Sequence, residues 1–135
     1  MLLVYEVLEK VESAKSKKEK VEILKTNESW ALKDIIRGSL DPNVLFNLPE
    51  GSPPYTPCEG HNAPSNLLKR NKDFRFFVKG GPGDKLPAFK RESIFIALVE
   101  SIHPKDAELV ISMINKKFNK KIKREVIREA FPNLI

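Results

Sequence analysis

The chain has 135 residues and one cysteine, and apolar residues make up 41% of it. This composition predicts one domain with a hydrophobic core, and the single cysteine excludes an intramolecular disulfide and fits a reducing cytoplasm. The apolar runs are far shorter than the ~20 residues of a membrane span, and the early Glu6 argues against a signal peptide, so we expect a cytoplasmic protein without a membrane partner.

The net charge of +6 is unevenly distributed along the chain. Residues 1–60 contain eight basic and ten acidic side chains, whereas residues 61–135 contain sixteen basic and eight acidic ones. A concentration of basic residues is typical of proteins that bind polyanions. We therefore expect a nucleic-acid-binding face in the second half of the chain.

Three helices are predicted in residues 1–40. Residues 4–11 place apolar side chains at helical spacing, and a second helix is expected to begin at the capping box Ser16–Glu19 and to run through Lys25. A third helix is expected over residues 28–39, where apolar residues again follow the helical period. It should stop at Asp41–Pro42, because the residue before a proline avoids the helical conformation.

Residues 41–64 contain six of the ten prolines and predict a long irregular connection. Loops of this length are often functional or are tied down over the core. Several apolar residues favour a connection that packs over the helices: Val44, Leu45, Phe46, Leu48 and Tyr55.

Residues 65–135 are expected to be helical again. One helix is predicted over residues 65–79, a tight turn at Gly80–Asp84, a helix after Pro87, and another from Pro104, a residue suited to the first helical position. The last helix is expected to begin after Asn119, a good N-cap residue. With no period-two alternation, the sequence predicts an all-α fold: a single compact domain of about seven helices with residues 1–40, 41–64 and 65–135 as its parts.

Catalytic and metal chemistry find little support. Cys58, His61 and His103 are the whole supply of thiols and imidazoles, too few for an ordinary zinc site, and no carboxylate pair suggests acid–base catalysis. Residues 71–77 mix basic and aromatic side chains, as single-strand binders do, although the spacing of Phe74 and Phe77 fits core positions and leaves only Phe76 as a candidate for exposure. We expect no cofactor, no metal and no enzymatic activity.

The strongest functional signal is the basic segment, which we define as residues 116–124. Six of its nine residues are basic and none is acidic. Placed at the start of the predicted last helix, these cations would oppose the helix dipole, so local stability does not explain them. A phosphate bound at the helix N-terminus would explain them.

The two ends of the chain resemble a known domain. The matching stretches are residues 3–11, 16–24, 32–36, 105–110, 113–118 and 126–135. They are similar to the N-terminal, all-helical DNA-binding domain of T-even-type phage ATP-dependent DNA ligases, and the chain also resembles small proteins of T4-like marine phages. It departs from the ligases in having Lys120 and Lys121 where they have small residues and a glycine, and in lacking the Lys-x-Asp-Gly adenylation motif.

The resemblance implies a stand-alone module that binds duplex DNA across the minor groove, mostly through the backbone and without sequence specificity. Such a module would be an accessory in phage replication or repair and would also bind a replication or repair protein. Carried onto this sequence, the implied DNA-binding residues are Lys116, Lys117, Asn119, Lys120, Lys121, Lys123 and Arg124. Charge placement alone adds weaker candidates: Lys17, Lys18, Lys69, Arg70 and Lys72. The alternative is a protein-interaction adaptor that keeps the ligase-like fold and uses the acidic first 60 residues and the proline-rich connection.

Overall fold

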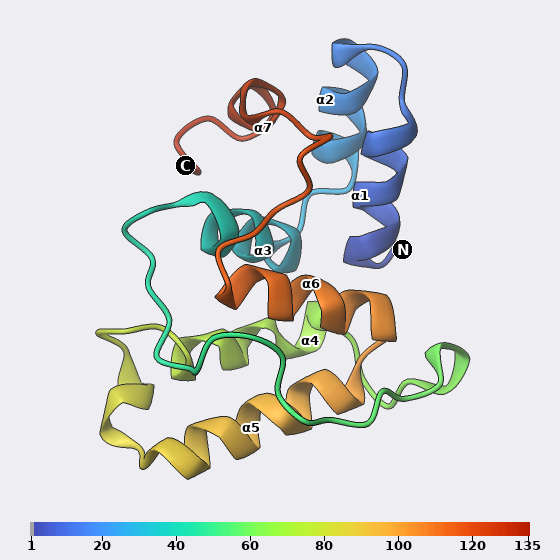
Figure 1. Ribbon diagram of the computed structural model, residues 1–135. Helices are drawn as coiled ribbons and strands as arrows, with labels where there is room; N and C mark the ends of the chain where they lie inside the picture. The colour runs from blue at the N-terminus through green and yellow to red at the C-terminus, as the bar shows by residue number, and fades with distance from the viewer. Residues whose placement is uncertain (1) are drawn as a thin grey trace.

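The computed structural model describes residues 2–135 and is all-helical (Figure 1). The described residues form seven α-helices: α1 (Val4–Ser13), α2 (Lys17–Thr26), α3 (Trp30–Leu40), α4 (Leu67–Arg70), α5 (Ala88–Ser101), α6 (Pro104–Ile114) and α7 (Arg124–Ala130). Three short 3₁₀ helices accompany them: η1 (Gly60–Asn62), η2 (Asn71–Phe76) and η3 (Pro82–Lys85). The prediction of an all-α, single compact domain with about seven helices is confirmed.

Helix α6 lies at the centre of the arrangement and packs against α1, α3 and α5. In Figure 1, α5 lies below α6 and α3 lies above it, while α1, α2 and α7 form the upper part of the molecule. Helix α2 packs against both α1 and α7. The last helix of the chain is therefore positioned by its packing against α2.

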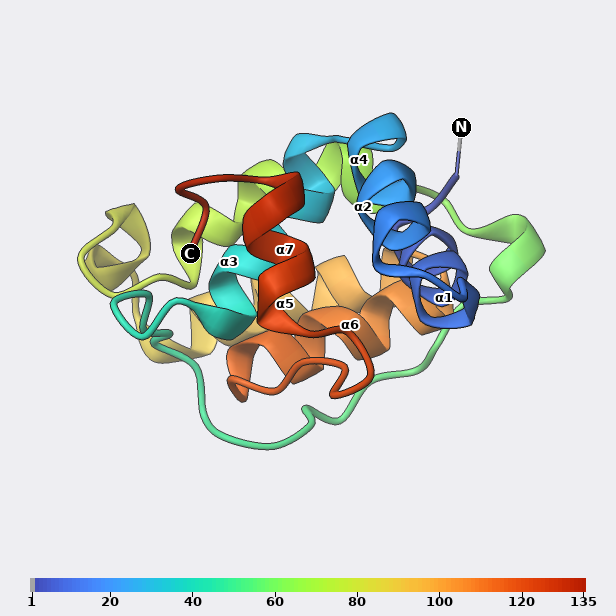
Figure 2. The same ribbon diagram turned by 90° about the horizontal axis from the view of Figure 1, so that it is seen from above.

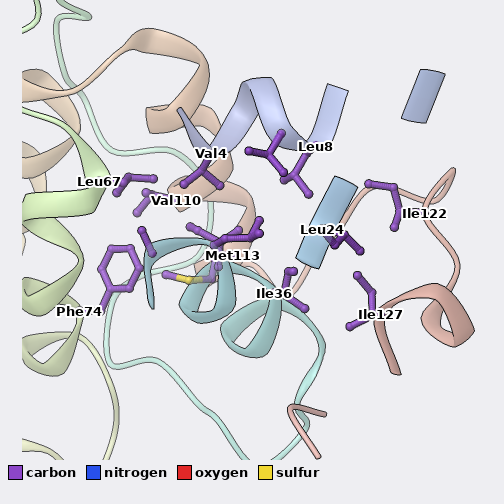
Figure 3. Close-up of a cluster of buried hydrophobic side chains, with 14 of the residues drawn as sticks. Val4, Leu8, Leu24, Ile36, Leu67, Phe74, Val110, Met113, Ile122 and Ile127 are labelled. Carbon is purple, nitrogen blue, oxygen red and sulfur yellow. The ribbon is translucent and has the colours of Figure 1, made fainter. Parts of the chain in front are cut away.

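A continuous hydrophobic core joins these helices. Figure 3 shows Met113 of α6 and Ile36 of α3 among its central side chains, and Leu24, Ile122 and Ile127 gathered at the end of the core beside α2 and α7. Ile122 is buried although it precedes α7. It anchors the basic segment to the core.

The first three helices agree closely with the predictions. The Ser16 hydroxyl accepts the Glu19 amide at 3.1 Å, and the Ser29 hydroxyl accepts the Leu32 amide at 3.1 Å, so both are side-chain N-caps. Helix α3 ends at Leu40 with Asp41 as its C-cap, where the Asp41–Pro42 signal placed the stop. Among the described residues, no helix combines the length and the apolar character needed to span a bilayer.

The connection from α3 to α4 is irregular, as predicted, and packs over the helices through Phe46, Leu48 and Tyr55. Leu45 differs from the prediction, because 52% of it is exposed. Phe46 forms an isolated antiparallel bridge with Val78. This bridge ties the start of the connection to the segment that follows η2.

The helix predicted over residues 65–79 is wrong in its extent. Helix α4 covers only Leu67–Arg70, and the chain then tightens into η2. Val78 forms the bridge with Phe46 and lies outside any helix. The core positions were nevertheless predicted correctly, because Phe74 and Phe77 are buried, and Phe76 is half-buried.

Candidate nucleic-acid interface

The basic segment is mostly a turn, not the start of a helix. Helix α7 begins at Arg124, and its N-cap is Lys123 rather than Asn119. The prediction that the last helix begins after Asn119 is therefore wrong, and Lys120, Lys121 and Lys123 do not occupy a first helical turn. An anion bound at the helix N-terminus therefore does not explain these lysines.

Lys116 is half-buried, and its ammonium group is turned toward backbone carbonyls. It has a positive φ of 56° and stands just past the end of α6, where its N–H bonds to the Met113 carbonyl at 3.0 Å and the Lys117 N–H bonds to the Ser112 carbonyl at 2.9 Å. These two bonds form a Schellman motif. The residue with positive φ in this motif, here Lys116, is usually glycine. The predicted role of Lys116 in phosphate binding is thus corrected to a structural one.

The Lys116 ammonium group stabilises the end of a different helix. It donates hydrogen bonds to the carbonyl oxygens of Gly38, of Asp41 at 2.8 Å and of Val44 at 2.7 Å. Carbonyls at a helix C-terminus lack intrahelical donors, and a cation there also complements the helix dipole. Burial lowers the pKa of Lys116, and the charge of Asp41 partly opposes this shift.

Glu12 of α1 fixes the turn at the middle of the basic segment. Its carboxylate accepts a hydrogen bond from the Asn119 amide at 2.7 Å and lies 3.0 Å from the Lys121 ammonium group. The Asn119 side-chain oxygen accepts the Lys121 N–H at 2.9 Å, which closes an Asx turn. The hydrogen bond from Asn119, followed by that from Lys121, lowers the pKa of Glu12. Both predicted DNA-binding residues are therefore used within the chain.

The remaining basic residues of the segment face solvent. Lys117, Lys120, Lys123 and Arg124 are exposed, and none of them forms an ion pair with any residue of the described chain. Arg128 was not singled out from the sequence, but it lies four residues after Arg124 and is also exposed. Residues four apart on a helix share one face, and this spacing was the signal available for finding it.

The acidic residues of α7 are already paired. Lys17 of α2 lies 3.8 Å from the Glu125 carboxylate and 3.4 Å from that of Glu129. Glu125 and Glu129 form their own row on α7, about 100° around the helix from the row of Arg124 and Arg128. The weaker candidate Lys17 is therefore shared by two glutamates and offsets part of their charge instead of adding to the basic surface.

A groove of about 430 Å³ separates α1 and α6 beside the basic segment. Its walls carry Glu9, Glu12 and Glu108 together with Lys105 and Lys117. This mixture of charges offsets the charge of Lys117 and is unfavourable for a polyanion. We therefore define the outer basic face as Lys120, Lys123, Arg124 and Arg128.

Three of the other weaker candidates, Lys69, Arg70 and Lys72, do not extend this face. Helix α4 and the basic segment lie on opposite sides of the molecule in Figure 2, which separates Lys69 and Arg70 from the outer basic face. Arg70 is half-buried and bonds to the Asp73 carboxylate at 2.8 Å. Lys72 is exposed on η2, and Lys18 is exposed on α2 without an ion pair in the described structure. No continuous surface joins residues 69–72 to the basic segment.

The residues with metal-binding or nucleophilic chemistry are dispersed. The Cys58 thiol donates to the Ile102 carbonyl at 2.9 Å, whereas His61 is exposed beside Glu59. His103 stacks on Tyr5 with ring centroids 4.4 Å apart. Across residues 2–135, no three His, Cys, Asp or Glu side chains are grouped so that they could hold a metal ion.

Comparison with known proteins gives a family but no described relative. No curated protein and no solved structure matches the chain. One family profile matches residues 7–120, a range that reaches from α1 into the basic segment and ends before α7. The chain therefore belongs to the family described as "Family of unknown function (DUF6433)".

Proposed function

We propose that the protein binds the sugar–phosphate backbone of duplex DNA, without sequence specificity, through the outer basic face. The observation that carries this proposal is the set of four exposed cations, none of which forms an ion pair within the described residues. Of the acids nearby, Glu12 is held by Asn119 and Lys121, and Glu125 and Glu129 share Lys17. Uncompensated cations on one surface attract phosphates and release the counterions of DNA.

The rigid attachment of this face also supports the proposal. Glu12 holds the turn from one side, and the buried Ile122 anchors it from below. Because the backbone is already ordered, binding need order only the long side chains, which limits its entropic cost. Contacts to phosphates carry no sequence information, so we expect similar affinity for unrelated duplexes.

Charge reversal tests the location of the interface. The triple variant Lys120→Glu, Lys123→Glu and Arg124→Glu removes three of the four cations, and we expect it to abolish most binding to a labelled duplex in fluorescence polarisation. Each lost phosphate contact should reduce the slope of log K against log salt by roughly 1.

A matched control separates location from net charge. The variant Lys69→Glu, Lys85→Glu and Lys90→Glu changes the total charge equally at exposed residues outside the outer basic face. We expect it to retain near-normal duplex binding, and unchanged helical circular dichroism should accompany both variants. Equal losses in the two triple variants would contradict the assigned face, and the absence of binding to any duplex at low salt would contradict the function.

A further inference from the structure

A second hollow lies away from the outer basic face, between α3, the connection that follows it, and η2. It has a volume of about 380 Å³, within the range of small-molecule sites. The buried side chains of Phe74 and Met113 contribute to its lining, together with the half-buried Phe46 and Val78. The hollow is therefore mainly apolar at its base.

Basic side chains border this apolar hollow. Arg37 of α3 and Lys72 and Arg75 of η2 line it and are exposed. The Arg75 guanidinium is itself supported by the Phe76 ring, 4.9 Å away, which reduces the side-chain freedom lost on binding.

The acidic residues near the hollow are already engaged. Asp34 accepts a hydrogen bond from the Asn71 amide at 2.9 Å, and Asp41 lies 3.7 Å from Arg37. Asp73 of η2 is taken by Arg70. Burial raises the pKa of Asp34, and the Asn71 hydrogen bond opposes this shift. Three cations and one carboxylate line the hollow. The hollow thus has a net positive surround over an apolar base.

These features define the ligand by its chemistry. A bare inorganic anion would gain nothing from the apolar base, and a neutral ring would leave the cations unused. A planar ring can stack on Phe or on a guanidinium plane, and the Asn71 amide and Asp34 carboxyl can exchange hydrogen bonds with polar ring edges. A phosphate attached to that ring would pair with Lys72 or the arginines.

We propose that this hollow, bordered by Arg37, Lys72 and Arg75, binds one unpaired nucleotide, with its base over the Phe46 and Phe74 side and its phosphate on the basic rim. Basic and aromatic residues of the stretch 71–77 would then take part in nucleotide binding. The ligand is either a free mononucleotide or the unpaired end of a nucleic-acid strand. This site is separate from the outer basic face and does not rest on the function proposed above.

Fluorescence of 2-aminopurine nucleoside monophosphate provides a direct probe, because stacking quenches the emission of this base. We expect saturable quenching by the wild-type protein with one nucleotide bound per chain. The matching nucleoside, which lacks the phosphate, should bind at least about tenfold more weakly, and inorganic phosphate should compete only at concentrations at least about tenfold above the mononucleotide.

Paired variants locate the site. Lys72→Glu with Arg75→Glu should reduce binding at least about tenfold, and Lys72→Gln with Arg75→Gln should reduce it in the same direction. Lys85→Glu with Lys90→Glu changes the charge equally at exposed residues outside the hollow and should leave quenching unchanged, as should the triple variant of the outer basic face. Circular dichroism verifies that each variant is folded.

A single-stranded oligonucleotide carrying 2-aminopurine at its end distinguishes the two sources of the ligand. The comparison is made in the triple variant of the outer basic face, so that this face does not hold the oligonucleotide. Tighter binding of the oligonucleotide than of the mononucleotide then assigns the hollow to a strand end, and equal or weaker binding assigns it to the free nucleotide. The proposal is overturned by the absence of saturable quenching, by equal effects of the pocket and control variants, or by inorganic phosphate competing as well as the mononucleotide.

Discussion

Asp106 lies in the first turn of α6 and is buried, with 1% of the residue exposed. One carboxylate oxygen accepts the Tyr5 N–H at 2.9 Å, and through this bond Asp106 caps the first turn of α1. The other oxygen has no partner among the described residues. Burial raises the pKa of Asp106 to about 6, the Tyr5 N–H and His103 oppose this shift, and Glu6 adds to it.

This raised pKa makes Asp106 a source of pH-dependent stability. The folded protein binds the proton more tightly than the unfolded chain, so the contribution is most favourable below about pH 4 and is lost as pH rises to about 6. The loss is on the order of 3 kcal/mol in the free energy of unfolding. We expect Asp106→Asn to be more stable than the wild type at pH 8, with the difference shrinking toward pH 4.

Urea unfolding of the two proteins across this pH range measures the difference. Comparing variant with wild type cancels the contributions of other carboxylates, such as Glu12 and Asp84, whose pKa values are lowered. A constant difference between the two stability curves would contradict the assigned role of Asp106.

Lys116 gives a second prediction for a single residue. In Lys116→Met, the carbonyl oxygens of Gly38, Asp41 and Val44 lose their shared donor. Leaving buried acceptors unsatisfied costs about 1–3 kcal/mol. Because these hydrogen bonds are only part-buried, we expect the free energy of unfolding to fall by about 1 kcal/mol. Duplex binding by the folded variant should be unchanged. A stable variant with weakened DNA binding would restore Lys116 to the interface.

The close approach of η2 and η3 yields a prediction for an element. Gly83 is buried, and a Cβ atom at this position would overlap the backbone carbonyl group of Phe76. Backbone cannot move aside as a side-chain end can, so we expect Gly83→Ala to destabilise the protein by more than about 2 kcal/mol. The exposed neighbour on η3 serves as the control, and Lys85→Ala should change thermal stability by no more than about 0.5 kcal/mol. Similar melting of the two variants would contradict this packing.

The elements that could be predicted from the sequence are those with local signals. Helices α1, α2 and α3 follow from apolar spacing and, for α2, from the Ser16 cap, which acts within three residues of its partner. The Ser29 cap of α3 is equally local, although the prediction did not use it. The start of α7 could not be predicted, because Asn119 suits an N-cap and an Asx turn equally well. Its contact with Glu12, far away in the sequence, accompanies the turn conformation. The Phe46–Val78 bridge is a similarly distant contact beside η2.

The same distinction applies to the candidate site. The concentration of charge in residues 116–124 is visible in the sequence, but which cations remain free is decided by tertiary contacts. Lys116 donates hydrogen bonds to carbonyls at the end of α3, and Lys121 forms an ion pair with Glu12. Conversely, Arg37 and Arg75 belong to separate elements, and only the folded structure shows that both line the hollow beside Phe46.

At the scale of the whole molecule, the net charge of +6 does not form one basic surface. Cations gather on the outer basic face and around the nucleotide-sized hollow, while mixed charges line the groove between α1 and α6. If net charge alone attracted DNA, charge reversal at any exposed lysine would lower the affinity for DNA equally. If DNA binds through the outer basic face, only charge reversal within that face lowers the affinity strongly.

A salt titration of duplex binding decides whether phosphate contacts by the outer basic face account for the proposed function. Contact with about four phosphates predicts that log K falls against log salt with a slope near −4 for both nicked and intact duplex, and near −1 for the triple variant Lys120→Glu, Lys123→Glu and Arg124→Glu. A slope near zero for the wild-type protein, or the same slope for the wild type and the triple variant, would contradict duplex binding through the outer basic face.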